Sequence, residues 1–251
     1  INFLSKKTRL QVSTFPQSGS ELLPERIFSP IRSALKSGSV LFLVPKKGYA
    51  SALMCKKCRN IARCECGGKL SRRSATAVPE CVLCSKVYSS LKCQWCQQDV
   101  MILLGRGGER HLEEIGRAFP GLPTHFSNSE SPITQLPRNP ALVISTPGME
   151  PHIVGGYSAV VLLDGDSFFS YSDLRAQERA RENCFSAAAL VAPNGEVITV
   201  VNSSNPITAA LAQWNPKVML TRELIELREI GFPPFARSIV MEVENSEATL
   251  I

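Results

Sequence analysis

The most constraining feature of this 251-residue chain is the distribution of its nine cysteines, eight of which lie between residues 55 and 96. The eight form four close pairs: Cys55 and Cys58, Cys64 and Cys66, Cys81 and Cys84, and Cys93 and Cys96. Two thiols in one tight turn can both point at a single ion, and a structural zinc takes four such ligands in a tetrahedron. The spacing therefore predicts two four-cysteine zinc sites. A thiol–disulfide redox centre and an iron–sulfur centre are the alternatives.

A disulfide framework is disfavoured because such frameworks are typical of small secreted chains. The first residues, Ile1 to Arg9, lack the apolar core of a signal peptide. No apolar run approaches the roughly 18 residues that a membrane helix needs. The length leaves room for one large domain or two small ones. We therefore expect neither a secreted nor a transmembrane protein, and a chain that opens on Ile1 suggests a fragment or a processed product.

Positive charge is concentrated in the same segment. The chain carries a net charge of +6, yet residues 46–97 hold eleven Lys and Arg against two Glu, so this segment is +9 and the remainder is −3. Two zinc ions with four thiolates each would contribute −2 apiece and leave the segment at about +5. Part of the excess is explained by neutralisation of the zinc–thiolate charge. The rest favours a phosphate-binding surface, because clustered Lys and Arg give the sequence-independent part of nucleic-acid affinity.

The candidate DNA contacts are basic residues in or next to the cysteine segment. They are Lys46, Lys47, Lys56, Lys57, Arg59, Arg72 and Arg73. Three aromatic residues, Tyr49, Tyr88 and Trp95, alternate with the charges and could stack on bases. Each aromatic residue taken singly is more often a packing residue.

Outside the cysteine segment the sequence predicts alternating strands and helices. Apolar runs of buried-strand length occur at 40–44, 100–104, 141–145, 159–163 and 196–201, the last after the turn Pro193-Asn194-Gly195. Helices are predicted at 109–119, from about residue 172, at 206–213 and at 222–229. This alternation predicts a mainly parallel α/β sheet with the cysteine segment inserted after the first core strand. Residues 238–244 alternate like a strand and suggest the start of a further domain.

Several motifs then agree, in order, with one family. They are Phe42-Leu-Val-Pro-Lys-Lys-Gly-Tyr-Ala50 followed by Cys55-Lys-Lys-Cys58, all eight cysteines, Gly105-Arg-Gly-Gly-Glu109, Leu162-Leu-Asp-Gly-Asp166, Asp173-Leu-Arg-Ala-Gln-Glu-Arg179 and Gly231-Phe-Pro-Pro234. Together they resemble the second helicase lobe of the PriA family of primosomal replication-restart proteins. The resemblance covers roughly residues 25 to 245.

The resemblance implies a RecA-like helicase lobe formed by residues 1–54 and 97–230. It implies a double-zinc insert at 55–96 and the start of a C-terminal α+β domain at 231–251. It also implies nested zinc ligands, which spacing alone does not select over sequential ones. The first set is Cys55, Cys58, Cys93 and Cys96, and the second is Cys64, Cys66, Cys81 and Cys84. The implied partners are DNA, single-stranded-DNA-binding protein and a loader of the replicative helicase, in the cytoplasm at the bacterial nucleoid.

The chain also departs from the family pattern. The family carries a Gln-x-x-Gly-Arg-x-Gly-Arg motif whose arginines reach the γ-phosphate of ATP, and loss of such an arginine lowers hydrolysis by orders of magnitude. The corresponding positions here are Ser186, Ala189, Leu190, Ala192 and Pro193. A family lysine before the Asp-x-Asp strand is absent from residues 146–150, and no phosphate-binding Gly-x-x-x-x-Gly-Lys-Ser/Thr loop is present. We therefore assign no catalytic or nucleotide-binding residue, and Gly105-Arg-Gly-Gly108 is interpreted as a strand-to-helix turn.

Other reactive residue types have structural interpretations. Asp164 and Asp166 are expected to shape a loop and cap a helix rather than hold a metal. His111, His125 and His152 show no nucleophile partner. Arg175, Arg179 and Arg181 are expected to pair with Glu178 and Glu182 on a solvated helix face, and Cys184 is expected to be a small buried residue.

Three functions are compatible with these features. The first, which we favour, is a degenerate PriA-like protein that binds DNA and helps reload the replication machinery without ATPase activity. The second is an active 3′-to-5′ DNA helicase whose nucleotide-binding lobe lies upstream of Ile1. The third is a zinc-stabilised protein-interaction scaffold without DNA contact.

Overall fold

The structure is a computed structural model that describes residues 10–16, 23–45, 52–58, 60–72, 77–104, 108–137, 139–171 and 173–239. Its largest part is a six-stranded sheet with the strand order β1-β10-β9-β2-β8-β7, in which every pairing is parallel. The strands are β1 (Gln11–Thr14), β2 (Val40–Leu43), β7 (Thr124–Ser127), β8 (Leu142–Ser145), β9 (Tyr157–Leu162) and β10 (Val191–Thr199). The expectation of an α/β fold with a mainly parallel sheet is confirmed.

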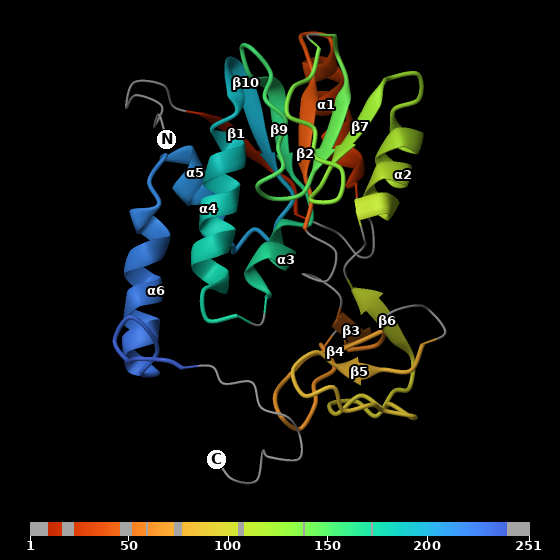
Figure 1. Ribbon diagram of the computed structural model, residues 1–251, viewed down its shortest axis with the longest axis vertical. Helices are drawn as coiled ribbons and strands as arrows, with labels where there is room; N and C mark the ends of the chain where they lie inside the picture. The colour runs from red at the N-terminus through yellow and green to blue at the C-terminus, as the bar shows by residue number, and fades with distance from the viewer. Residues whose placement is uncertain are drawn as a thin grey trace.

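The central strands are buried on both faces, as the continuous apolar runs at β2, β8 and β9 predict. One face packs against the 3-10 turn at Glu25–Ile27, α1 (Phe28–Leu35) and α2 (Gly108–Ala118). The other face packs against α3 (Gly165–Phe169), α4 (Ala176–Ala188), α5 (Ile207–Ala212) and α6 (Lys217–Glu229). Figure 1 shows the sheet between these two helical layers, with α4, α5 and α6 on one side and α2 at the opposite edge.

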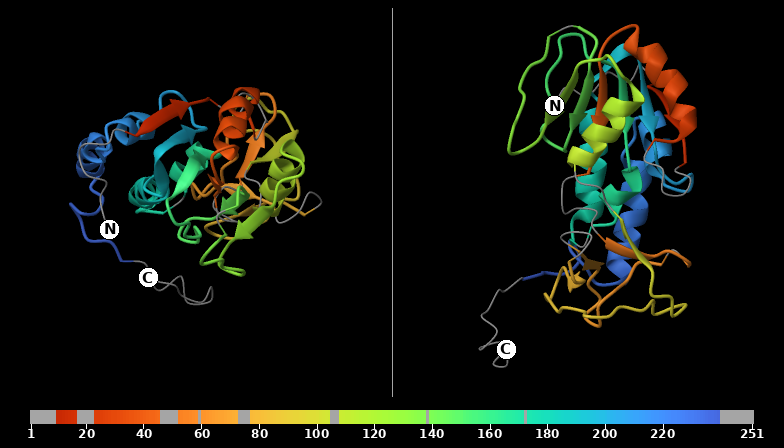
Figure 2. Two further views of the ribbon diagram at one scale, coloured as in Figure 1. Left: turned by 90° about the horizontal axis from the view of Figure 1, so that it is seen from above. Right: turned by 90° about the vertical axis from the view of Figure 1, so that its right-hand side faces the viewer.

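The cysteine segment forms a separate small unit, here called the cysteine module (residues 52–104). Strand β3 (Ala52–Cys55) pairs antiparallel with β6 (Met101–Leu104), and β4 (Leu70–Ser71) pairs antiparallel with β5 (Glu80–Cys81). Figure 1 and the right-hand view of Figure 2 show the module beyond the end of the sheet at which β2 and β9 finish. The run at 100–104 is therefore a strand, but its partner is β3 and not the parallel sheet. An apolar run indicates a strand without specifying the strand that it pairs with.

The other expected elements are found with shifted bounds. Strand β10 begins before residue 196, and the predicted turn at residues 193–195 lies within it as an irregularity in its register with β9. Helix α6 begins at Lys217 rather than at residue 222. Strands β1 and β7 and helices α1 and α3 are additional elements. The residues of the predicted turn at 105–107 and of the predicted strand beyond 239 lie outside the described residues. No described helix is long and apolar enough to span a bilayer.

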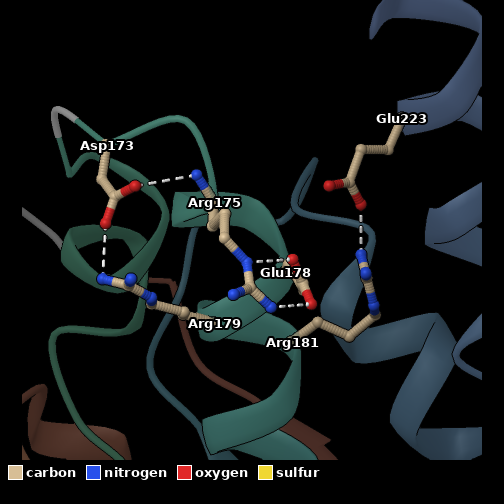
Figure 3. Close-up of polar contacts among 6 residues, drawn as sticks. All are labelled: Asp173, Arg175, Glu178, Arg179, Arg181 and Glu223. Carbon is tan, nitrogen blue, oxygen red and sulfur yellow. Dashed lines mark hydrogen bonds and ion pairs between the residues drawn. The ribbon is translucent and has the colours of Figure 1, made fainter. Parts of the chain in front are cut away.

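The predicted charge pairs of α4 are only partly as expected. Figure 3 shows that Arg175 pairs with Glu178 on the helix surface, while Arg179 reaches Asp173. Arg181 does not lie on a solvated face. It pairs with Glu223 of α6, and the two side chains are only 12% and 16% exposed. Charge patterning within one helix cannot reveal a partner that lies on another helix.

We expect Arg181→Met to lower the free energy of unfolding by about 2 kcal/mol, because it leaves the carboxylate of Glu223 buried without its cation. The matched control is Arg222→Met, since Arg222 pairs with Glu226 while the two side chains are 78% and 58% exposed. The control should change stability by less than about 0.5 kcal/mol. Urea unfolding of both variants measures the difference, and equal effects would contradict a buried, energetically important pair.

Candidate metal centres and the surrounding surface

The first group of sulfurs comes from the two ends of the cysteine module in the sequence. Cys55 is the last residue of β3 and Cys58 lies in the turn that follows it, while Cys93 and Cys96 come from a second turn before β6. The Sγ atoms of Cys55 and Cys96 lie 3.4 Å apart, as do those of Cys58 and Cys93. All four sulfurs lie within 4.8 Å of one another. We call these four residues the outer group.

The inner group consists of Cys64, Cys66, Cys81 and Cys84. Its sulfurs also lie within 4.8 Å of one another, with 3.6 Å between Cys64 and Cys84 and 3.4 Å between Cys66 and Cys84. A zinc–sulfur bond of about 2.3 Å gives a tetrahedron whose edges are about 3.8 Å. Both groups are therefore close to the size that a four-thiolate zinc site requires, and the cysteines are free thiols rather than disulfides.

The structure brings the cysteines together in the nested arrangement rather than the sequential one. The β3–β6 ladder lies at the base of the module and joins the first and last turns, while β4 and β5 join the inner two. Spacing along the chain could not choose between the arrangements, because it shows which two cysteines share a turn but not which two turns meet. The fold makes the choice through strand pairing.

Local backbone geometry explains how each pair forms a tight turn. Ser85 and Gln97, directly after two of the pairs, have φ values of 57° and 59°. Their N–H groups donate to the carbonyls of Cys81 (3.1 Å) and Cys93 (2.9 Å). The pair with one intervening residue, at 64–66, uses Gly67 in the same way, and its N–H donates to the carbonyl of Cys64 at 2.9 Å. The turn at this pair is therefore closed one residue earlier than the turns at 81–84 and 93–96.

Several groups outside the two sets of cysteines support the sulfurs. The hydroxyl of Tyr88 donates to Cys64 Sγ at 3.1 Å, and the Asn60 side-chain amide donates to Cys58 Sγ at 3.4 Å. Such donors orient metal ligands and tune their basicity. Tyr88 thus has a contact within the module, in addition to the base stacking considered for it. The role of Asn60 was missed, and its position two residues after a cysteine was the available signal.

The electrostatics of the inner group favour a bound cation. The hydrogen bond from Tyr88 lowers the pKa of the Cys64 thiol to about 6. The backbone N–H of Gly68 acts to lower the pKa of Cys66, but neighbouring thiols, first that of Cys84, raise it to about 12. The neighbouring sulfurs therefore oppose ionisation of Cys66, and a bound cation would compensate that charge and favour its thiolate.

The basic residues of the module divide into paired and exposed ones. Lys86 forms a 2.7 Å ion pair with the carboxylate of Glu65. Lys56 and Lys57, in the turn between Cys55 and Cys58, are both exposed. Arg72 is half-buried. The candidates Lys46, Lys47, Arg59 and Arg73, and with them Tyr49, lie outside the described residues.

Trp95 is the most exposed aromatic residue of the described module, at 73% of its surface. It lies in the turn between Cys93 and Cys96, which belong to the same group of sulfurs as Cys55 and Cys58. The outer group therefore connects a turn with two exposed lysines to a turn with an exposed indole. That combination can offer cations to phosphates and an aromatic face to a base.

The positions of the missing arginine motif lie at the end of α4 and the start of β10. Ala192 and Pro193 border a shallow hollow of about 530 Å³ at the start of β9 and β10. Its lining consists of apolar residues, glycines, serines and one asparagine, and none of the described residues that line it is charged. The hollow therefore offers no charged side chain to a phosphate.

The remaining candidates lie apart from the cysteine groups. Asp164 precedes α3, and Asp166 accepts hydrogen bonds from the Asn202 N–H at 2.6 Å and the Asn205 side chain at 2.9 Å, so it shapes the loop after β10. Cys184 is 1% exposed in the core, and burial raises the pKa of its thiol to about 12. The three histidines, His111, His125 and His152, lie in α2, in β7 and in a bridge to Gln135.

Comparison with known proteins identifies relatives along most of the chain. No family model matches it. Replication restart protein PriA of Mycobacterium tuberculosis is 42% identical over 225 residues, which cover 87% of this chain and 34% of that protein. The same protein of Mycobacterium leprae is 38% identical over 87% of this chain and 35% of its own length. That of Rickettsia felis is 26% identical over 84% of this chain and 36% of its own length. The chain thus spans about a third of the curated relatives that it matches.

Proposed function

This chain belongs to the PriA family of replication restart proteins, and we propose that it forms the metal-bearing, DNA-contacting part of such a protein. In this role it binds stalled forks, D-loops or single strands and helps to reload the replication machinery, without helicase or ATPase activity of its own. Single-stranded-DNA-binding protein and a helicase loader are the proposed protein partners. The parallel sheet is the proposed RecA-like second lobe (1–54 and 97–230), with the insert at 55–96 and a C-terminal domain that starts in 231–251.

The observation that carries the DNA-binding proposal is the outer group of cysteines. A zinc ion held by Cys55, Cys58, Cys93 and Cys96 would fix the two turns that carry Lys56, Lys57 and Trp95. Each zinc would supply structural cross-linking rather than chemistry, since four protein thiolates leave no open position for a substrate. The same holds for a zinc ion at the inner group. The module would then present cations and an indole from a rigid support.

We expect Lys56→Gln/Lys57→Gln to lower the affinity for single-stranded DNA about tenfold at 0.1 M salt. The slope of log K against log salt should also become shallower by about 1.4, because each lost phosphate contact accounts for roughly 0.7. Trp95→Ala should lower affinity by about 1–3 kcal/mol with an unchanged salt slope, because stacking releases no counterions. Fluorescence anisotropy with a labelled oligonucleotide measures both effects.

The matched control is Lys217→Gln/Arg237→Gln, which removes two exposed positive charges outside the module. Its salt slope should stay close to that of the unmodified chain. If both double variants weaken binding equally, only net charge matters and the module is not the DNA contact. Affinity that neither variant changes would mean that the DNA contact lies outside the module. No measurable binding by the unmodified chain would favour the alternative of a protein-interaction scaffold without DNA contact.

The proposal that ATPase activity is absent is supported by the uncharged hollow at the positions of the family's arginines. Transition-state stabilisation of phosphoryl transfer needs a cation at that place, worth about 10³–10⁵ in rate. The test is ATP hydrolysis by the complete gene product, with and without forked DNA. DNA-stimulated hydrolysis that a mutation in an upstream phosphate loop abolishes would instead establish the active 3′-to-5′ helicase.

A further inference from the structure

The two cysteine groups differ in how they meet solvent. In the inner group Cys64 and Cys81 are buried, whereas Cys66 and Cys84 are both exposed. The exposed pair is also in close contact, with 3.4 Å between the two Sγ atoms. In the outer group Cys55 and Cys93 are buried, and Cys58 and Cys96 are only partly exposed. The inner group is the one that presents two neighbouring sulfurs to solvent.

The sequence around Cys66 explains this exposure. Gly67 follows it directly and carries no side chain that could cover the sulfur. A Cβ atom at Gly68 would lie 2.6 Å from Cys81 Sγ, so a larger residue does not fit there without a shift of the inner group. The space around a Cβ at Gly67 is open within 4 Å. The inner group is thus compact, but its sulfur at Cys66 is left exposed to solvent.

The contact pattern also selects which sulfurs could join. In the outer group, the contacts at 3.4 Å are Cys55 with Cys96 and Cys58 with Cys93, so each includes one buried sulfur. In the inner group, Cys66 and Cys84 come from different turns and both face solvent. A small oxidant can therefore reach the sulfur of either cysteine, and the other sulfur is close enough to react with the oxidised one.

We propose that Cys66 and Cys84 form an oxidation site for hydroperoxides, which converts the inner zinc site to a disulfide. This inference rests on the zinc sites of the proposed function. One thiolate attacks a peroxide oxygen, the O–O bond breaks, and a sulfenic acid and one water (or alcohol) result after protonation. The second thiolate attacks the sulfenic sulfur, the S–S bond forms, and hydroxide leaves as water. The two sulfurs lose two electrons to the peroxide, and zinc, deprived of two ligands, is released.

Susceptibility to such oxidation follows both the thiolate character and the exposure of a sulfur. Zinc would hold the sulfurs of both groups as thiolates, so exposure is the difference between them. The outer group should therefore react more slowly, and the β3–β6 ladder that it holds together should persist while the inner half opens. A small-molecule dithiol reduces the disulfide again, and zinc then rebinds. The device would make half of the module sensitive to peroxide and leave the other half in place.

The test uses the full chain loaded with zinc. Zinc content is measured first, and sub-millimolar hydrogen peroxide is then added while a chromogenic chelator reports zinc release and alkylation mass spectrometry maps the cysteines. We expect one zinc per chain to leave at least about tenfold faster than the second, together with a Cys66–Cys84 disulfide. Release of both ions at one rate, or a disulfide within the outer group, would overturn the proposal.

Two histidine variants sharpen the result, because histidine keeps a zinc ligand but cannot form a disulfide. Cys84→His should slow the fast release about tenfold and abolish the disulfide. Cys58→His, the matched control in the outer group, should leave the fast phase and the Cys66–Cys84 disulfide unchanged. If Cys84→His fails to hold two zinc ions, the disulfide mapped in the unmodified chain still shows whether Cys66 and Cys84 are the oxidation site.

The experiment separates this inference from the proposed function. A starting content other than two zinc ions per chain contradicts the zinc sites themselves. Two zinc ions that leave together contradict only the selective oxidation. DNA affinity is measured on the untreated chain, so its outcome is independent of the peroxide response.

Discussion

Removal of zinc is expected to unfold the cysteine module while the six-stranded sheet stays folded. The hydrophobic cluster of the module has four buried members, Leu53, Cys64, Leu70 and Cys81, and two of them are cysteines. So small a core cannot stabilise a chain of this length by itself. Structural zinc supplies on the order of 10 kcal/mol, which here becomes folding free energy. Hydrogen–deuterium exchange with mass spectrometry should show loss of protection across residues 52–104 and retained protection in β2, β8 and β9.

The matched variants for this prediction are Cys93→Ala and Cys184→Ala. Cys93→Ala should lose one zinc and the protection of the β3–β6 ladder. Cys184→Ala should keep both zinc ions and lower the stability of the sheet-bearing part by about 1 kcal/mol, because it removes one small buried side chain. A metal-free module with unchanged exchange protection would show that packing alone maintains its fold.

Gly156→Ala is expected to lower the free energy of unfolding by about 3 kcal/mol. Gly156 precedes β9 with a φ of 85°, a conformation that costs an L-residue about 1–2 kcal/mol. A Cβ there would lie 2.8 Å from both the Ala192 nitrogen and the Leu190 oxygen, which are backbone atoms at the start of β10. Relief of the overlap requires a backbone shift, which adds a further cost of about 1–3 kcal/mol.

The neighbouring glycine provides the control for this substitution. Gly155 has a φ of 94°, and a Cβ atom added there would meet nothing within 4 Å, so Gly155→Ala should cost only the conformational part, about 1 kcal/mol. Urea unfolding followed by circular dichroism gives both values. Equal losses in the two variants would mean that β9 and β10 separate at their start with little resistance.

The parts of the sheet that could be predicted are those whose residues are buried on both faces. The apolar runs of β2, β8 and β9 are buried, and burial on both faces accounts for their apolar composition, whereas the order in which they pair was not predicted. The edge strands β1 and β7 were missed because they read Gln-Val-Ser-Thr and Thr-His-Phe-Ser, without a long apolar run. Helix α1 was not predicted because Pro30 argues against a helix in the sequence. Proline is nevertheless tolerated in the first turn of a helix, where Pro30 lies.

The candidate site, like the sheet, could be predicted only in part. Spacing predicted the eight sulfurs and their division into two groups of four, because thiol pairs in tight turns have few other uses. Spacing does not encode how strands β3 to β6 pair. That pairing decides which cysteine pairs share a group, places the hydroxyl of Tyr88 beside Cys64 and leaves Cys66 exposed. The pairing of Arg181 with Glu223 was missed for a related reason, since it depends on how two helices pack together.

The β3–β6 ladder also has a consequence for the sheet from which the module departs. It places Ala52 opposite Leu104, so the ends of the module meet and the connection from β2 to α2 behaves as a loop of about a dozen residues. Without the ladder, the same connection becomes a loop of about sixty residues. Each doubling of loop length costs about 0.6 kcal/mol of closure entropy, so the lobe would lose about 1.5 kcal/mol. The cysteine module would thus stabilise the parallel sheet by shortening the effective length of the connection between β2 and α2.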